Sequence, residues 1–311
     1  RNILAPLLPG NSAPLAPHAV HLVTEAMRRA FADRARFLGD PDFAAIPVRG
    51  LLDKRYADEL RASIDPERAS ASEQLLLPDP QRYAGHGRAR AARTALWHEA
   101  EDTTHFSVVD AAGNAVANTY TINYFFGNAV TVPGLGFLLN DEMDDFSPKP
   151  GTPNTAGLVH AAANKIEPRK RPLSCMTPTI VVRDNETVLV LGSPGGPRIV
   201  NAVFLVLLNR LAFGLDLAEA VALPRYHHQW LPDKLFVERE GIAASLLETL
   251  RARGHTVEQR GNVGTVNAIE RNPVTGELYG VGDWRRGGVA RGLPQRESKV
   301  SGEQVAPAKQ P

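Results

Sequence analysis

Apolar side chains recur at helical spacing near the start of the chain. Between residues 17 and 36 they return every three or four positions, at Val20, Val23, Met27, Ala30 and Phe31. This pattern predicts one long helix, with Arg28, Arg29 and Arg34 facing outward. Residues 51–64 predict a second helix. The segment 65–101 is polar and weakly periodic, so we expect an exposed, mobile loop there.

Two later runs alternate between faces in the manner of β-strands. Residues 103–109 form the first run and residues 115–123 the return strand. The residues between them suit a type I turn closed by a left-handed Gly113. If Asp110 pairs with Asn114, Thr103 lies opposite Thr121, and Asn123 lies on the same face. The hairpin therefore predicts a polar pocket in which two hydroxyls meet.

The second half of the chain mixes short strands with helices. A glycine-bounded run at 134–140 predicts a strand, and runs at 179–183 and 187–191 predict a hairpin of largely covered strands. Residues 198–211 predict a helix that is apolar around much of its circumference and is therefore buried. Together these runs predict a mixed α and β fold with hairpins, without internal repeats.

Composition narrows the class of protein. The 311 residues are 43% hydrophobic, which is typical of a globular chain with a sizeable core. The formal net charge of +1 argues against a nucleic-acid or membrane-surface role that rests on bulk charge. The single cysteine, Cys175, allows no intrachain disulfide. No apolar run reaches the roughly 18–20 residues of a membrane span, and no signal peptide opens the chain.

Thr103 is the candidate nucleophile. If the chain were cut before it, Thr103 would carry both a hydroxyl and a free α-amine. That amine titrates at about 7.7–8.0 and could serve as the general base near neutral pH. Thr121 would hold the hydroxyl in place. Spacing alone favours a solvated, threonine-rich strand over this interpretation.

Two further stretches carry candidate chemistry, each with an ordinary structural alternative. Residues 141–146 are crowded with carboxylates, which suit either a solvated loop or the binding of a substrate ammonium. Glycines at 192–196 precede a helix, and their N–H groups could bind an oxyanion or simply form a tight turn. The stretch lacks the Lys-Ser/Thr of a phosphate loop and the first glycine of a serine-hydrolase elbow.

Adjacent His227 and His228 lack a third ligand at metal spacing, so we expect a structural role for them and no metal site.

The motifs together resemble a known family. Asp-Thr-Thr-His-Phe-Ser-Val-Val-Asp, followed by Gly-Asn-Ala-Val-Ala-Asn-Thr-Tyr-Thr-Ile-Asn, is similar to the start of the small subunit of gamma-glutamyltranspeptidases. Residues 32–43 are similar to the late part of that family's large subunit. The resemblance runs from about residue 17 to about residue 285. It implies an α+β fold, the four-layer αββα sandwich of N-terminal-nucleophile hydrolases.

The resemblance also implies an activity and the residues that perform it. The chain would be a self-processing zymogen that cuts itself before Thr103, giving a large-subunit region over residues 1–102 and a small-subunit region over 103–311, with 286–311 a disordered tail. It would then cleave the gamma-glutamyl amide of glutathione or a related compound and pass the acyl group to water, an amino acid or a peptide. No cofactor, metal or nucleic acid is implied, and the location would be periplasmic or extracellular. The implied catalytic residues are Thr103, Thr121, Gly195 and Gly196, and the implied substrate-binding residues are Asn123, Glu142, Asp145, Ser174 and Cys175.

Two positions depart from the family pattern. Counting along the lid segment 147–170 places Ala156 where some members carry an aromatic gate. Cys175 stands where the family has the second of two serines that bind the substrate carboxylate, and a thiol is a weak donor. We expect Cys175 to be a small buried hydrophobe and not a nucleophile. These departures keep open a related acylase that acts on cephalosporin or glutaryl side chains.

A further alternative is an inactive fragment. The family has a long segment before the position of residue 1, including an arginine that clamps the substrate carboxylate, and this sequence does not contain it. A non-catalytic, uncleaved domain that binds amino acids or a partner therefore also remains open.

Overall fold

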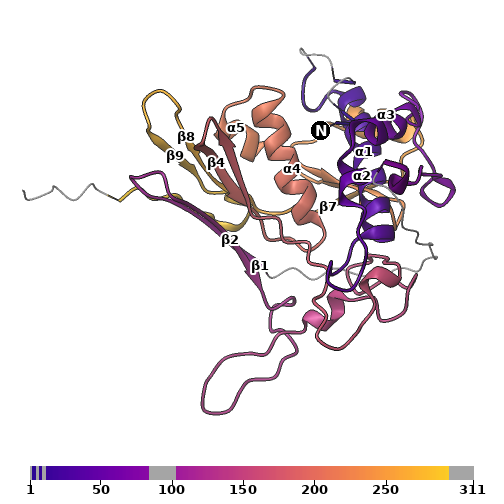
Figure 1. Cartoon of the computed structure of the whole chain (residues 1–311). Coiled ribbons are helices and arrows are strands. Elements are labelled where there is room, and N and C mark those ends of the chain that lie inside the picture. Colours follow the sequence, from indigo (N-terminus) through magenta and orange to yellow (C-terminus); the bar gives the residue numbers. More distant parts are fainter. Residues whose placement is uncertain (1, 5–6, 9–11, 84–102, 294–311) are drawn as a thin grey trace, which may run out of the picture.

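The computed structural model describes residues 2–4, 7–8, 12–83 and 103–293. Two packed sheets, with helices on one side, form the part that carries the candidate site (Figure 1). The expected cleavage loop at 84–102 and the end of the expected tail at 294–311 lie outside the described residues. The part of the tail that is described, residues 286–293, is largely exposed and has little regular structure.

The predicted hairpin is present with the predicted register, but its return strand ends at Thr121 and does not continue to residue 123, because Asn123 adopts a left-handed φ. Strands β1 (Thr103–Val109) and β2 (Ala115–Thr121) are antiparallel, and Thr103 pairs with Thr121. Gly113 closes the turn at φ 84°, a left-handed conformation that glycine adopts without strain. The Asp110 side chain accepts from the backbone N–H groups of Ala112 and Asn114, which fixes the turn.

A second sheet lies against this hairpin. Its order is β3-β4-β8-β9, formed by β3 (Thr179–Arg183), β4 (Glu186–Gly192), β8 (Asn267–Arg271) and β9 (Leu278–Val281). Both hairpin strands contact β4, and β1 also contacts β8. Helices α4 (Arg198–Leu211) and α5 (Leu217–Ala222) cover the other face of this sheet (Figure 1). The order helix, sheet, sheet gives three successive layers of the expected αββα sandwich.

A buried apolar cluster joins the sheet to its helices. It contains Leu189 and Leu191 of β4, Ile199, Ala202, Val203 and Val206 of α4, and residues of α5 and β8. The apolar circumference predicted for α4 is therefore buried, as expected. The predicted covering of the 179–191 hairpin holds only for β4, because β3 lies at the sheet edge and alternates between exposed and half-buried residues.

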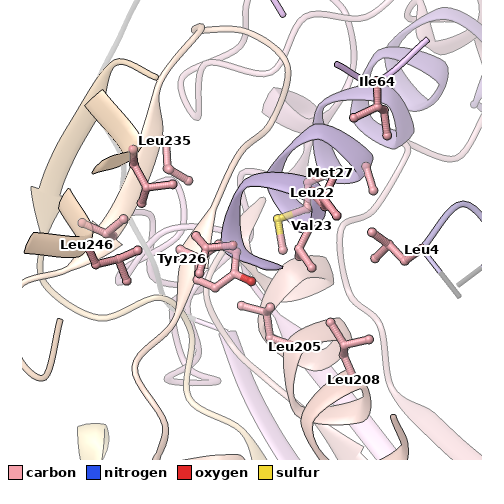
Figure 2. Close-up of a cluster of buried hydrophobic side chains, with 14 of the residues drawn as sticks. Leu4, Leu22, Val23, Met27, Ile64, Leu205, Leu208, Tyr226, Leu235 and Leu246 are labelled. Atoms are coloured by element: carbon pink, nitrogen blue, oxygen red, sulfur yellow. The ribbon is translucent and has the colours of Figure 1, made fainter. Parts of the chain in front are cut away.

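The first helix of the chain packs on a third, three-stranded sheet. Its strands are β5 (Tyr226–His227), β6 (Leu235–Glu238) and β7 (Val257–Arg260). Helix α1 (Pro17–Phe37) meets α6 (Ala244–Ala252), α4 and β6 through the core residues in Figure 2, which include Leu22, Val23 and Met27 of α1. Residues before and after the expected cut therefore share one core.

Two other sequence predictions of secondary structure are wrong in detail. The expected helix at 51–64 is two helices, α2 (Val48–Leu52) and α3 (Lys54–Ala62), because Asp53 ends the first and caps the second through the Arg55 N–H. The expected strand at 134–140 is a series of turns with a single bridge between Thr131 and Leu138, since Gly134 and Gly136 both adopt left-handed φ values. Short 3₁₀ helices complete the described structure: η1 (Ser72–Gln74), η2 (Pro80–Tyr83), η3 (Glu142–Asp145), η4 (Ala162–Asn164) and η5 (Trp284–Arg286).

The prediction that three arginines of α1 face outward is also wrong. Arg28, Arg29 and Arg34 are all buried. Arg28 and Arg29 pair with the buried Glu25 on the same helix, and Arg29 also donates to the Ser63 backbone carbonyl at 2.7 Å. Polar residues at every third or fourth position normally indicate a helix face in water. In α1 these residues face other protein segments, which supply their hydrogen-bond and ion-pair partners. Among the described residues, no helix is long and apolar enough to span a membrane.

Candidate active site

Thr103 and Thr121 meet at the end of the hairpin. The Thr103 Oγ1 donates to Thr121 Oγ1 at 3.2 Å, and Thr103 is only 9% exposed. Thr121 Oγ1 also accepts from the backbone N–H of Asn123 at 2.8 Å. The Thr103 hydroxyl is therefore held by an oxygen that is itself fixed by the backbone. Asp102, on the other side of the expected cut, lies outside the described residues.

Asn123 connects this hydroxyl pair to the acidic segment. Its φ is 72°, a left-handed value that asparagine tolerates better than most residues. Its Nδ2 donates to the Asp141 carbonyl at 3.4 Å, and the next N–H, that of Tyr124, donates to Asp141 Oδ1 at 3.1 Å. The end of β2 and the start of the carboxylate cluster are thus tied together, which brings Asn123 into the predicted pocket.

Glu142 and Asp145 face each other within η3. Burial raises the pKa of both carboxyls, and the neighbouring negative charge raises the pKa of Glu142 further. The buried Arg34 opposes the rise in the pKa of Asp145. Because the pKa of each carboxyl is raised and the two groups interact, the pair favours holding one proton between them. Such a pair attracts a cation that can take the place of the proton.

Arg34 is a site residue that the sequence pattern concealed. Its Nη2 donates to the carbonyls of Leu173 and Ser174, at 3.3 and 3.4 Å, and lies 3.1 Å from Cys175 Sγ. One guanidinium from α1 therefore supports the segment expected to bind a carboxylate. The only available signal was that Arg34 falls within the stretch 32–43 that resembles the family's large subunit.

Ser174 and Cys175 lie side by side but differ in access. Ser174 is exposed, and its Oγ accepts from the Met176 N–H at 3.0 Å. Cys175 is buried, as predicted, and burial raises the pKa of its thiol. A buried thiol whose thiolate is disfavoured is a poor nucleophile. The geometry thus leaves Ser174, and not Cys175, accessible to a substrate.

The glycine turn follows β4 at the Thr103 end of the two packed sheets. A Cβ built on Gly192 would lie 2.3 Å from the His105 ring, so the end of β4 touches β1 two residues from Thr103. Beyond it, Gly195 and Gly196 have φ values of 137° and 52°. No described residue accepts a hydrogen bond from the N–H group of either glycine. Because Gly195 is buried, its N–H is expected to have an acceptor, and an anion would provide one.

Three buried histidines near these elements serve the structure. His105 bonds Thr119 and Ser107, and burial lowers its pKa to about 4, so the ring is neutral. His227 bonds Asn201 and Gln229, while His228 bonds Asp233, which agrees with the structural role predicted for this pair. In the described ranges, no group of three or more His, Cys, Asp or Glu side chains could hold a metal ion.

The segment expected to form a lid, residues 147–170, is bonded to a distant part of the chain at Ala156. Gln229 Nε2 donates to the Ala156 carbonyl at 3.2 Å, which ties the segment to the residues after β5. Asn154 Nδ2 likewise donates to the Asp144 carbonyl at 3.1 Å. The segment is therefore held by hydrogen bonds from side-chain amides to backbone carbonyls, one of them in the acidic cluster, while the Ala156 side chain is only a methyl group.

Comparison with known proteins agrees with this arrangement. The family model described as Gamma-glutamyltranspeptidase matches residues 3–293. The chain belongs to this family. A relative named glutathione hydrolase proenzyme, from Escherichia coli (strain K12), is 45% identical over 267 residues, which cover 86% of this chain and 43% of the relative. The chain thus spans less than half the length of that curated relative.

Two solved structures place the fold among those of gamma-glutamyltranspeptidases and acylases. Gamma-glutamyltranspeptidase from Pseudomonas nitroreducens, complexed with L-DON, is 49% identical with a TM-score of 0.59, and the match covers 61% of this chain and 100% of that chain. Cephalosporin acylase from Bacillus halodurans has a TM-score of 0.74 at 23% identity, over 91% of this chain and 46% of that chain. The second likeness shows the fold alone. The predicted α+β fold of the N-terminal-nucleophile hydrolase type is confirmed.

Proposed function

We propose that this chain carries the nucleophile of a self-processing gamma-glutamyl acyltransferase and glutathione hydrolase. The buried Thr103–Thr121 hydroxyl pair is the observation that supports this most directly. Residues 1–102 would supply the end of the large chain and residues 103–311 the small chain. By analogy with the family, the location would be periplasmic or extracellular.

The first reaction is self-cleavage. Thr103 Oγ attacks the carbonyl carbon of Asp102, the C–N bond of that peptide breaks, and the Thr103 nitrogen takes up a proton to become a free amine. Water then hydrolyses the ester, which returns the Thr103 hydroxyl and leaves a carboxylate on Asp102. Thr121, which accepts from the Thr103 hydroxyl, orients the attacking oxygen.

The second reaction is acyl transfer by the new N-terminus. The Thr103 amine accepts the hydroxyl proton as Oγ attacks the gamma-carbonyl of the substrate. The N–H groups of Gly195 and Gly196 stabilise the tetrahedral oxyanion, an effect worth roughly 3–4 kcal/mol per donor. The leaving amine takes the proton, and the resulting ester is released by water or by an amino acid or peptide. No cofactor is needed for these steps.

Substrate recognition uses the charged and polar groups around the hydroxyl pair. The Glu142–Asp145 pair would accept the α-ammonium of the glutamyl group in place of its shared proton, and Asn123 would orient the acyl chain. Ser174 would donate to the α-carboxylate. Cys175 would contribute little, because its thiol is buried against Arg34.

A related acylase for glutaryl or cephalosporin side chains is the second candidate. Cys175 weakens the carboxylate site, and Ala156 leaves the lid without an aromatic side chain. Both changes lie at positions expected to contact the substrate, so they would alter which acyl group fits. The two candidates differ in their need for an ammonium, which a glutaryl group does not have.

Mass spectrometry of the purified full-length protein tests the proposal. We expect two chains, the smaller one beginning at Thr103, and release of the anilide from a gamma-glutamyl anilide. The Thr103→Ala variant should remain a single chain, while Thr104→Ala, which changes the exposed neighbour, should still be cut. A wild-type protein that stays in one piece would argue for the non-catalytic alternative.

A further inference from the structure

Four buried charged side chains form a closed network that the mechanism above does not use. Arg225 donates to Asp283 at 2.8 Å, and Arg285 donates to Glu238 at 2.7 and 2.8 Å and to Asp283 at 3.1 Å. Arg225 is 1% exposed and Asp283 is fully buried. The members come from segments around β5, β6 and η5, far apart in the sequence.

The network holds one loop by its backbone. Val263 N–H donates to Glu238 Oε1 and Val266 N–H donates to Asp283 Oδ2, both at 2.8 Å. Arg225 Nη1 donates to the carbonyls of Val263 and Gly264, at 3.4 and 3.2 Å. Consecutive peptide groups between 263 and 266 are thus each bonded to a charged side chain.

The 263–266 loop packs directly against the glycine turn. Thr265 N–H donates to the fully buried Ser193 Oγ at 2.8 Å, and Ser193 lies within the turn, before Pro194 and Gly195. A Cβ built on Gly195 would lie 3.1 Å from the Gly264 Cα, and a Cβ on Gly264 would lie 2.7 Å from Ser193 Oγ. The loop and the turn therefore fit together without room for a side chain at either glycine.

We propose that Arg225, Glu238, Asp283 and Arg285 are positioning residues for the oxyanion turn, an inference that rests on the function proposed above. Buried ion pairs add little net stability, because the cost of removing charges from water offsets their attraction. Their benefit here is geometric: the network fixes the 263–266 loop, the loop fixes Ser193 and Gly195, and the turn presents its N–H groups at the reacting carbonyl. Transition-state stabilisation by such donors depends on their position within tenths of an ångström.

The test compares kcat and KM for a gamma-glutamyl anilide in the full-length protein. Arg225→Met keeps an unbranched stem but removes the guanidinium donors. Ser193→Ala removes the hydroxyl that accepts from the Thr265 N–H and donates to the Pro194 carbonyl. We expect kcat to fall about 10- to 100-fold in both variants, a part of the roughly 10²–10³-fold loss seen when one oxyanion donor is removed. KM should stay within about twofold, because the Glu142–Asp145 pair and Ser174 are unchanged.

Arg29→Met is the matched control. Arg29 is an equally buried arginine that pairs with Glu25 and bonds Ser63, away from the turn. At matched loss of thermal stability it should retain wild-type kcat per folded molecule. A similar loss of kcat in Arg29→Met, or full kcat in folded Arg225→Met and Ser193→Ala, would overturn the positioning role. A wild-type protein that releases no gamma-glutamyl anilide would instead defeat the proposed function.

Discussion

If the Glu142–Asp145 pair binds the substrate ammonium as proposed, substrate choice should depend on pH. Because burial raises the pKa of both carboxyls, the pair retains a proton near neutral pH. A substrate ammonium must take the place of that proton, so its binding weakens as the pH falls and the pair becomes fully protonated. A glutaryl substrate has no ammonium and should bind without this penalty.

The assay is the ratio of kcat/KM for gamma-glutamyl anilide to that for glutaryl anilide, measured from pH 5 to 8.5. Protonation of the Thr103 amine, which has a reference pKa of about 7.7–8.0, slows both substrates alike and cancels in the ratio. The ratio should therefore rise with pH through the raised pKa range of the pair. This rise reports ammonium recognition alone.

The Asp145→Asn variant measures how much the carboxyl pair contributes to the ratio of the two kcat/KM values. The substitution removes one carboxyl of the pair, and a hydrogen bond to a charged group contributes about 1.5–3 kcal/mol. Since each 1.4 kcal/mol is tenfold, the ratio at pH 8 should fall roughly 10- to 100-fold and lose its pH dependence. Asp144→Asn is the control, because the Asp144 carboxylate accepts from Thr155 Oγ1 at 2.8 Å and is not part of the pair. A ratio that is flat with pH, or equal effects of the two variants, would refute the reasoning.

Three further predictions concern single contacts. Thr121→Val should lower both the rate of self-cleavage and kcat about tenfold or more, because the hydroxyl of Thr121 holds Thr103. Thr121→Ser keeps that hydroxyl and should not lower either rate. Chain masses measure self-cleavage, and anilide release measures kcat. Gly192→Ala should destabilise the fold by about 1–3 kcal/mol in thermal unfolding, since its Cβ overlaps the His105 ring. Burial raises the pKa of Asp33 to about 7, so its ionisation costs stability as the pH rises from about 4 through 7; Asp33→Asn should raise Tm at pH 8 and leave it unchanged at pH 4.

The hairpin was predictable from sequence because its rules are local. Alternation, a left-handed Gly113 and the length of the turn set the register, and the register alone placed Thr103 opposite Thr121. The glycine-rich turn before α4 was also predictable from the sequence. Its residue spacing could not, however, distinguish an oxyanion-binding site from a simple tight turn. The roles assigned to these residues came from the family resemblance and remain proposals.

The buried arginines could not be predicted, because their partners come from distant segments. Arg34 bonds carbonyls at 173 and 174, and Arg225 pairs with Asp283, so neither contact leaves a periodic trace in the sequence. Helical periodicity separates apolar from polar faces, but it cannot tell a polar face in water from one that is buried and paired. Buried polar networks are therefore the part of this site that only the structure reveals.

The position of Arg34 also explains why the proposed cut before Thr103 need not separate the two resulting chains. Helix α1 precedes the cut, yet it supplies the guanidinium that holds the carbonyls of Leu173 and Ser174 beyond the cut. The same helix buries Leu22, Val23 and Met27 against apolar side chains of α4, β6 and α6 (Figure 2). Each such side chain contributes about 1.5–3 kcal/mol on burial, so separation would expose this shared core to water. Cleavage can therefore free the Thr103 amine while the support for the carboxylate segment stays in place.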